Sequence, residues 1–404
     1  MTATHRLRRR FAAALTAAFS LALSACSANR YPNSIFERHT EFNREVLSIF
    51  KSLFVWATIV FVLVELALLW VLWRYRRREG APQPRHVHGN TTLEVLWTLI
   101  PAVVLVFIAV PTVRAIFRTQ AKAVPNALEV EVIGHQWWWE FRYPQYGVVT
   151  ANELYLPIGR TVNFALKTND VLHSFWIPRL GGKRDLIANH TNYLWFTPDS
   201  ADEQAWNGSC NEYCGASHAN MLFRAFTVSP AQFEQWVAHQ KSPAVFGAVP
   251  GVGAPAPPTP AATPVAFVSW PRERLPEYAI PNKPLPDGLG WNESLVGDPA
   301  RGQQVYSRSA CIGCHTIAGN PMSVGQIGPN LTHFGSRLTL GAGIYPNDAR
   351  HLALWIRNAR AMKPGVLMPT LGRGQYDPLL KTTVTTGLSD QEIADIVAYL
   401  QALK

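Results

Sequence analysis

Two patterns are missing from this chain, and each absence removes a class of function. The later part of the sequence contains no cluster of basic residues with aromatic residues between them, as expected for a basic nucleic-acid groove, which argues against a nucleic-acid partner. The two long apolar runs near the N-terminus contain no cluster of histidines, so the chain offers no metal site for oxygen within them. Any chemistry of that kind would have to take place in another protein.

Cysteine is also scarce, with only five residues among the 404 of the chain. Apart from Cys26, the cysteines form two close pairs, Cys210 with Cys214 and Cys311 with Cys314. Such spacings are typical of metal or cofactor attachment. A chain of this length is long enough for two or three domains, so we expect the two pairs to serve separate domains.

Positive charge is concentrated at the N-terminal end of the chain. Before residue 86 there are 13 Lys/Arg and 5 Asp/Glu, so +8 of the net +10 lies there, which is a membrane-topology signal. Four early arginines followed by an apolar run predict a lipoprotein-type signal peptide over residues 1–25. Cys26 would then be the lipid-modified first residue, and the alternative is a signal cut without lipidation.

Two apolar segments, Leu53 to Trp73 and Val95 to Val113, are each long enough to cross a bilayer as a helix. The loop between them holds five arginines and therefore faces the cytoplasm. For residues 26–120 we predict an N-terminal segment and a transmembrane hairpin in a bacterial plasma membrane, with the later domains on the periplasmic side. Acids in such segments are functional candidates, namely Glu65 and Glu94, although Glu94 is also a favourable helix-start acid.

The pattern changes to strand-like alternation from about Leu128 onward. Several short strands at close spacing predict an all-β sandwich or Greek-key barrel over residues 121–241. A short helix over 230–239, with Ser229 as its N-cap, should close this domain. The strands that we expect cover residues 128–133, 153–157, 161–167, 191–196 and 223–228.

Proline dominates the stretch that follows the β domain. About a dozen prolines lie between residues 243 and 286, so we predict a semi-extended Pro/Ala-rich linker over residues 242–291. Residues 292–404 then form a last, all-α domain. Its terminal helix is predicted by the capping box Ser389-Asp-Gln-Glu392 and by the apolar face that follows it.

The densest cluster of metal-binding side chains lies between residues 210 and 221. It contains Cys210, Cys214, His218 and Met221, and His173 lies upstream at the end of an expected strand. A mononuclear electron-transfer copper site needs two histidines, one cysteine and a weak methionine, so the second thiolate indicates two copper ions bridged by two sulfurs. A disulfide and a zinc site are the alternatives for this cysteine pair.

The second cysteine pair belongs to the motif Cys311-Ile-Gly-Cys314-His315. C-x-x-C-H is the attachment signal of c-type haem. Each thiol bonds to the haem, and His315 becomes the proximal iron ligand. This predicts one covalently bound haem in the last domain.

The sixth iron ligand is sought among the methionines that follow the motif. Met368 lies on a loop ahead of the last helix and is our prediction, with Met362 as the fallback. Met322 is too close to the motif in sequence. His333 and His351 are interpreted as surface or propionate-side residues.

These features together resemble subunit II of haem–copper cytochrome c oxidases, in the bacterial caa-type form with a fused C-terminal cytochrome c domain. The resemblance covers nearly the whole chain and implies a multidomain membrane protein. Its parts would be a two-helix transmembrane hairpin, a cupredoxin-like Greek-key sandwich and an all-α c-type cytochrome domain. The matching stretches are Glu94-Val-Leu-Trp-Thr-Leu-Ile-Pro101, Gly134-His-Gln-Trp-Trp-Trp139, Val171-Leu-His-Ser-Phe-Trp176 and the Cys210–Met221 loop.

The resemblance also implies roles for individual residues. In that family the dinuclear CuA centre is bridged by two thiolates, here Cys210 and Cys214. The backbone carbonyl of Glu212 would be a further copper ligand, and its side chain would reach a magnesium ion shared with subunit I. Trp137 matches the residue where electrons pass into CuA, and Glu94 matches an acid near a proton-uptake channel, while Glu65 receives no role. The remaining copper ligands carried over are His173, His218 and Met221.

The implied function is that of the electron-accepting subunit of an aerobic respiratory terminal oxidase. Electrons from an external cytochrome or complex III would reach the fused haem, then CuA, then subunit I, which reduces oxygen to water with proton translocation. Subunit III would be a further partner. The alternatives are a free electron-shuttle or copper-delivery lipoprotein, and the CuA subunit of a nitric oxide reductase.

Overall fold

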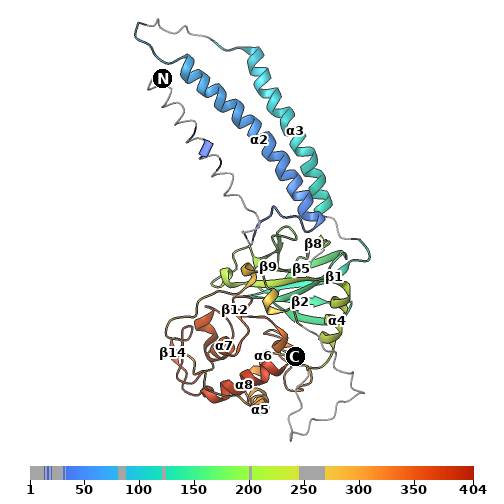
Figure 1. Cartoon of the computed structure of the whole chain (residues 1–404), viewed down its shortest axis with the longest axis vertical. Helices are drawn as coiled ribbons and strands as arrows, with labels where there is room; N and C mark the ends of the chain where they lie inside the picture. Colours follow the sequence, from blue (N-terminus) through green and yellow to red (C-terminus); the bar gives the residue numbers. More distant parts are fainter. Residues whose placement is uncertain are drawn as a thin grey trace.

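The computed structural model describes residues 31, 33–80, 88–120, 124–199, 203–244 and 269–404, with isolated positions at 13, 16, 17 and 20. Within these ranges the chain forms a helix hairpin, a β-sandwich and a helical domain, in that order along the sequence (Figure 1). The predicted signal peptide, apart from those isolated positions, and Cys26 lie outside the described residues.

The hairpin consists of helix α2 (Glu41–Arg74) and helix α3 (Thr91–Gln120), and each contains the segment predicted to cross a membrane. Most of their large apolar side chains are exposed, as expected for helices whose solvent is lipid rather than water. Pro101 and Pro111 lie inside α3. Figure 1 shows the hairpin projecting away from the two globular domains.

The first turn of α2 attaches the hairpin to the β-sandwich. The Thr40 side chain caps α2 through the Asn43 amide and donates to the Leu180 carbonyl. The Glu41 carboxylate accepts from the backbone N–H of Thr197 at 2.9 Å. These buried or half-buried contacts set where the membrane hairpin leaves the globular part of the chain.

The β-sandwich has two five-stranded sheets. One sheet has the order β3 (Val148–Ala151), β2 (Trp138–Tyr143), β1 (Leu128–His135), β5 (Val162–Thr168) and β8 (Asn192–Phe196). The other has the order β4 (Glu153–Pro157), β10 (Leu222–Val228), β9 (Gln204–Cys210), β6 (His173–Trp176) and β7 (Arg184–Leu186). Pairs β1–β5 and β4–β10 are parallel, which brings strands far apart in sequence together in each sheet.

Aromatic rings from both sheets fill the core beneath the copper-ligand loop. Phe175 and Phe223 stack at 5.1 Å between ring centroids, and Trp139 meets Phe223 edge-on at 5.5 Å. A Cβ at Gly208 would lie 2.0 Å from the Phe223 ring, so the glycine in β9 makes room for that ring. Rings of this size give the sheets a closely packed interior that holds the loops at one end.

The sequence predicted five of these strands and the closing helix. Helix α4 (Pro230–Lys241) starts at the predicted N-cap Ser229, which takes part in a capping box with Gln232. Strands β2, β3, β7 and β9 were not predicted, and for β6 the prediction was only that His173 lies at the end of a strand. Charged residues in β2 and β7, and glycine and asparagine in β9, weaken the alternation that marks a strand, and β3 is only four residues long. The strands that pair with them stabilise what the local sequence does not.

The second half of the predicted linker is packed, not extended. Residues 245–268 lie outside the described part of the chain, but from residue 269 the segment folds into the short turns η3 (Arg272–Arg274) and η4 (Glu277–Ala279). Trp270, Leu275 and Ala279 are buried in the sandwich core. Apolar residues between the prolines therefore cover the sandwich instead of spacing the domains apart.

The last domain is helical, as predicted. Helix α5 (Pro299–Arg308) packs against α8 (Asp390–Ala402), whose capping box at Ser389 is present. A helix that was not predicted, α7 (Ala349–Met362), completes the fold with the one-turn helix α6 (Cys311–Cys314). Short elements lie between them, namely η5 (Phe334–Ser336), β11 (Thr339–Leu340), β12 (Tyr345–Pro346), β13 (Tyr376–Asp377) and β14 (Thr382–Thr383).

We predict that Gly302→Ala destabilises the last domain by about 1–3 kcal/mol because of overpacking. A Cβ at Gly302 would lie 1.9 Å from the backbone oxygen of Asp395 where α5 crosses α8. Denaturant unfolding of the full chain, followed by helical circular dichroism, measures the change. Gly290→Ala is the control because a Cβ there meets nothing within 4 Å. Equal stability of the two variants would contradict the close crossing.

Candidate copper and haem sites

The copper-ligand candidates lie on the loop between β9 and β10, with a 3₁₀ turn, η2 (His218–Asn220), in the middle. These two strands are antiparallel neighbours. The backbone N–H of Cys210 donates to the Met221 carbonyl at 3.0 Å, which closes the base of the loop. The paired strands β9 and β10 thus hold Cys210 and Met221, the first and last ligand candidates of the loop, opposite each other.

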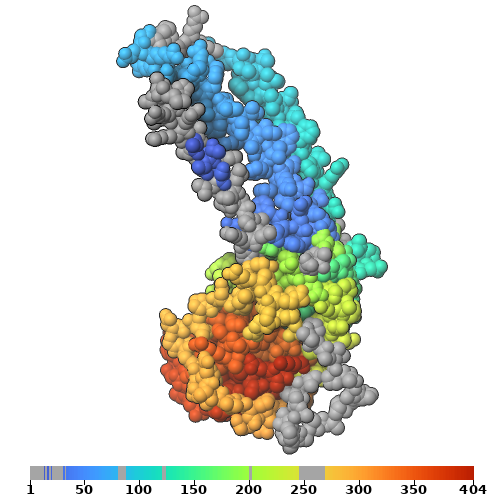
Figure 2. Space-filling view, viewed as in Figure 1, coloured from blue at the N-terminus to red at the C-terminus, as the bar shows by residue number. Residues whose placement is uncertain are grey.

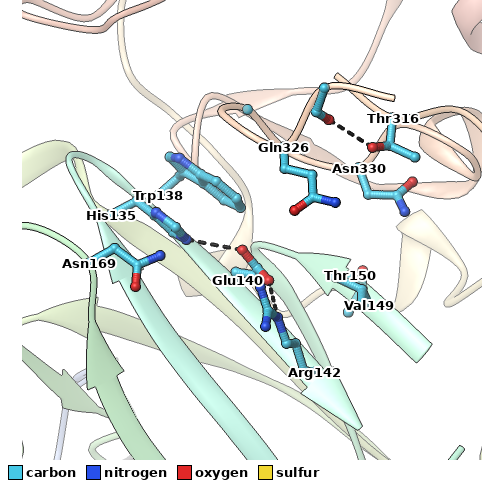
Figure 3. A pocket seen from close by; sticks show the side chains of 12 residues that line it. His135, Trp138, Glu140, Arg142, Val149, Thr150, Asn169, Thr316, Gln326 and Asn330 are labelled. Atoms are coloured by element: carbon cyan, nitrogen blue, oxygen red, sulfur yellow. Dashed lines mark hydrogen bonds and ion pairs between the residues drawn. The ribbon is translucent and has the colours of Figure 1, made fainter. Parts of the chain in front are cut away.

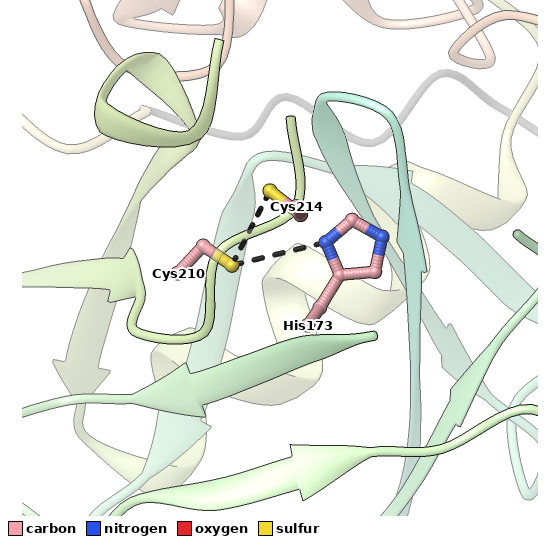
Figure 4. Close-up of side chains that lie close together, drawn as sticks. All are labelled: His173, Cys210 and Cys214. Atoms are coloured by element: carbon pink, nitrogen blue, oxygen red, sulfur yellow. Dashed lines mark hydrogen bonds between the residues drawn. The ribbon is translucent and has the colours of Figure 1, made fainter. Parts of the chain in front are cut away.

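His173 reaches the same place from a different part of the sequence. It begins β6, which pairs with β9 so that Phe175 lies opposite Cys210. The fully buried His173 ring points its Nδ1 at the Cys210 sulfur, 3.8 Å away, and the Cys210 and Cys214 sulfurs are 3.8 Å apart (Figure 4). Ligand atoms of these three residues lie within 4.8 Å of one another.

The other candidates surround the same two sulfurs. His218 Nδ1 is 3.6 Å from the Cys214 sulfur, and Met221 Sδ is 3.9 Å from it. The Glu212 carbonyl oxygen lies 3.3 Å from the Cys210 sulfur. The structure therefore brings together all six residues that the sequence analysis proposed as copper ligands.

The donor set fits the predicted copper pair. Cys210 and Cys214 are free thiols here, and their sulfurs are much farther apart than the roughly 2.0 Å of a disulfide bond. A hydrogen bond with Cys214 lowers the pKa of Cys210 well below its ordinary value, while the same contact raises the pKa of Cys214. Two sulfurs, two imidazoles and a thioether are soft or borderline ligands, which favours copper over zinc.

Asp170 holds the His173 ring in place from outside the cluster. Its carboxylate lies 2.7 Å from His173 Nε2, so the ring can donate there and keep Nδ1 for a metal. Burial opposes ionisation of Asp170, but hydrogen bonds from His173 and the Gln136 amide keep its pKa below the ordinary value. Burial likewise opposes protonation of His173, yet its hydrogen bonds with Asp170 and Cys210 raise its pKa.

Two side chains from the β1–β2 turn close the loop on its other side. The Trp137 indole donates to the Cys214 carbonyl at 2.9 Å, and the Gln136 side-chain amide donates to the same oxygen at 2.8 Å. Gly215, with φ +111°, allows the loop to pass the indole, because a Cβ there would lie 3.0 Å from it. Trp137 is thereby fixed against the loop that carries the copper ligands.

A cavity of about 510 Å³ lies mostly in the last domain, against the sandwich, and fits the predicted haem. Cys311, Cys314, His315 and Met368 line it, together with mostly apolar side chains. Trp137 also lines this cavity. The same indole therefore touches the copper-ligand loop and borders the haem-type pocket.

His315 is oriented for iron binding. Its Nδ1 lies 2.8 Å from the Pro329 carbonyl, which leaves Nε2 for a metal. Burial lowers the pKa of the imidazole and so favours the neutral, ligating form. Gly328 is required beside the ring, because a Cβ there would lie 2.5 Å from it.

The methionines and histidines that follow the C-x-x-C-H motif lie in different surroundings. Met368 lines the cavity, whereas Met362 is buried in the core and its carbonyl accepts from the Tyr345 hydroxyl at 3.0 Å. His333 is not a surface residue, because it is buried with its ring 4.3 Å from that of His239. Asp348 is the N-cap of α7 and accepts from the His351 backbone N–H at 2.9 Å, and the His351 ring lies 2.9 Å from the same carboxylate.

The two membrane acids lie apart from these sites. Glu94 is exposed in the first turn of α3, and Glu65 is exposed in the middle of α2. The Glu212 side chain is also exposed, and it accepts from the Tyr213 amide at 3.1 Å. Sequence reasoning missed Asp170 and Gln136. Asp170 directly precedes the Val171–Trp176 motif and Gln136 lies inside the Gly134–Trp139 motif, so both could have been found by their position.

A polar cleft of about 430 Å³ lies between the sandwich and the last domain (Figure 3). His135 stacks on Trp138 at 4.2 Å and lies 3.0 Å from the Glu140 carboxylate, which Arg142 also contacts. Burial raises the pKa of Glu140, but the hydrogen bonds from His135 and Arg142 outweigh it and leave the pKa low. The Glu140 carboxylate is thus paired with His135 and Arg142 within the sandwich.

The arrangement is that of a membrane-anchored electron-transfer protein, because two redox-type sites lie on adjoining domains outside an apolar helix pair. Family models agree with this class. Residues 39–115 match the transmembrane domain of cytochrome c oxidase subunit II, residues 148–227 match its periplasmic domain, and residues 299–404 match cytochrome c.

Individual relatives extend the match over most of the chain. Cytochrome c oxidase subunit 2 of Alkalihalophilus pseudofirmus is 32% identical over 83% of this chain and 80% of its own length. The protein of the same name from Bacillus sp. strain PS3 is 31% identical over 82% and 80%. The chain belongs to the cytochrome c oxidase subunit 2 family, in a form with a fused cytochrome c domain.

Among solved structures, the periplasmic domain of subunit II of cytochrome oxidase from Bradyrhizobium japonicum is similar to this chain. It is 29% identical, covers 30% of this chain and 97% of its own, and has a TM-score of 0.28. Membership of the family implies a CuA copper centre, a c-type haem and association with subunit I of a haem–copper oxidase.

We predict that Asp170→Asn lowers copper affinity about tenfold, because asparagine keeps an acceptor oxygen but loses the charge that orients His173. Competition with a copper chelator measures the change. Asp185→Asn is the control, since Asp185 is an exposed acid on the neighbouring strand β7. Equal affinities for the two variants would show that Asp170 does not support the site.

Proposed function

We propose that this chain is the electron-accepting subunit of an aerobic respiratory terminal oxidase. Electrons from an external cytochrome or complex III enter at the cytochrome domain and pass to the copper-binding loop. They leave toward subunit I, which reduces oxygen to water and translocates protons. The observation that carries this proposal is the position of Trp137 between the copper-ligand loop and the haem-type cavity.

The copper pair is held by six residues in this proposal. Cys210 and Cys214 would hold the copper ions together with His173, His218, Met221 and the Glu212 carbonyl. When bound, such a pair would supply a centre for one-electron transfer. The rigid strand ladder beneath the loop and the hydrogen bonds to the Cys214 carbonyl keep the ligands in place in both states.

In the cytochrome domain, Cys311 and Cys314 would attach one haem, and His315 and Met368 would bind its iron. A thioether ligand raises the reduction potential relative to a second histidine. His315 is fixed in the required tautomer by the Pro329 carbonyl. The apolar cavity walls exclude water and favour the reduced state.

Contacts with the partner subunits use residues that are exposed in this chain. The Glu212 side chain binds a magnesium ion shared with subunit I, and Glu94 takes part in proton uptake beside that subunit. Subunit III is a further partner of the membrane hairpin. The hairpin lies in a bacterial plasma membrane with both globular domains on the periplasmic side, and Cys26 is lipidated.

The alternative of a free electron-shuttle or copper-delivery lipoprotein is less well supported. A shuttle needs only an anchor, whereas this chain has two apolar helices joined to the sandwich by buried contacts at Thr40 and Glu41. Recovery of the chain from membranes without subunit I would favour this alternative.

Metal and haem analysis of the purified full chain tests the proposal. We expect two coppers and one covalent haem per chain, with one unpaired electron shared by both copper nuclei in paramagnetic resonance. His218→Ala should abolish this shared-spin signal and leave the haem spectrum intact, because the two cofactors have separate ligands. A shared-spin signal that survives in His218→Ala would refute the copper-ligand assignment.

We also predict that Glu94→Gln slows oxygen turnover of the assembled oxidase severalfold, with copper and haem spectra unchanged. The physical reason is that an amide of the same shape cannot carry a proton. Glu65→Gln is the matched control in the other helix. Turnover equal to that of the unmodified oxidase would leave Glu94 as a helix-start acid.

A further inference from the structure

The loop that carries Met368 lies directly against the copper-binding domain. It runs from Lys363, the residue after α7, to Met368 itself. Three of its residues contact the sandwich domain, and all three contacts fall on Trp137 or on the copper-ligand loop. Figure 2 shows that the two globular domains pack against each other.

The first contact is a buried lysine. Lys363 is 1% exposed, and its Nζ donates to the Trp137 carbonyl at 2.6 Å and to the Gly341 carbonyl at 2.9 Å. One amino group therefore joins a backbone oxygen of the sandwich to one of the cytochrome domain. Burial lowers the pKa of Lys363 to about 7, but the amino group can donate to both oxygens whether charged or neutral.

The second and third contacts come from the next two residues. The buried Ser217 hydroxyl, on the copper-ligand loop, donates to the Pro364 carbonyl at 2.6 Å. Gly365, with φ +83°, lies flat against Trp137, since a Cβ there would be 2.7 Å from the indole ring. Any larger residue at 365 would push the loop and the indole apart.

Other contacts join the two domains outside this loop. The buried Glu153 carboxylate accepts from the backbone amides of Leu338 and Thr339 at 2.8 and 3.0 Å, and the Leu222 amide donates to the Ala342 carbonyl. These contacts do not involve Lys363 and would remain in a variant in which Lys363 is changed. Lys363 additionally fixes the position of the Met368 loop against Trp137.

We propose that Lys363, Gly365 and Ser217 form a latch that fixes the loop bearing Met368 against the Trp137 indole. Lys363 is the positioning residue of this latch. The contact between the Met368 loop and Trp137 exists before electron transfer, so the cytochrome domain does not have to dock on the sandwich for each electron. The inference rests on the proposed electron transfer from the cytochrome domain to the copper-binding loop. It adds that an external donor cannot reach Trp137 from the side that this loop covers.

The latch is tested with Lys363→Met in the purified full-length oxidase. Methionine keeps an apolar stem of similar length but removes the donors that hold the two carbonyls. Lys381→Met is the matched control, because Lys381 is an exposed lysine of the same domain. Ser217→Ala is the second variant, and it decides the test if Lys363→Met fails to bind haem or copper.

Two measurements are made on each variant. Hydrogen exchange reports the protection of the amides at 365–368 and of the Trp137 segment, with and without copper. Photoreduction of the cytochrome domain, followed by the near-infrared copper absorption, reports the transfer rate. We expect faster exchange and a transfer rate about tenfold lower in Lys363→Met, with a new dependence on solvent viscosity and unchanged reduction potentials.

Ser217→Ala should show the same changes to a smaller extent, and Lys381→Met none. Transfer rates and exchange equal to those of the unmodified oxidase, in variants that retain both cofactors, would overturn the latch. Faster exchange with an unchanged transfer rate would also overturn it, because Lys363 would then serve stability alone. Absence of transfer in the unmodified oxidase would instead refute the proposed function.

Discussion

The carbonyl oxygen of Cys214 is the contact on which both sites depend. It accepts from the Gln136 and Trp137 side chains, so the copper-ligand loop is held by a turn some 80 residues earlier. If this oxygen lost its donors, the loop would lose the support opposite the strand ladder. The indole would also lose the contact that holds it between the copper ligands and the haem-type cavity. Buried polar groups of this kind are stable only when they are paired, which makes the geometry at Trp137 strongly determined.

A few buried polar side chains also join the two globular domains. Buried side chains from the sandwich, Glu153 and Arg224, bind backbone groups of the last domain. The segment after residue 269 covers the sandwich and so does not act as a free spacer. The two domains therefore form one packed unit, and the effective concentration of one site near the other is set by packing instead of by linker length.

Sequence reasoning succeeded where the chemistry is local. The spacing from Cys210 to Met221, the C-x-x-C-H motif, the two apolar spans and the capping boxes at Ser229 and Ser389 each follow from residues close together in the chain. The described structure contains all of these elements, and the family matches support the domains that carry them. It was weaker for β2, β9 and α7, because neighbouring strands and a core decide those elements more than local propensity does.

What the sequence by itself determined is the kind of ligand at each site, since side-chain chemistry belongs to the residue and not to the fold. The six copper candidates, the haem motif and Met368 follow from the sequence and its family resemblance alone. Only the tertiary structure decided which groups surround them. Asp170 behind His173, Gln136 on the Cys214 carbonyl and Lys363 on the Trp137 carbonyl are contacts across 3, 78 and 226 residues. The Gln136 contact depends on how the strands of the sandwich pack, and the Lys363 contact depends on how the two domains pack. No local pattern encodes either kind of packing.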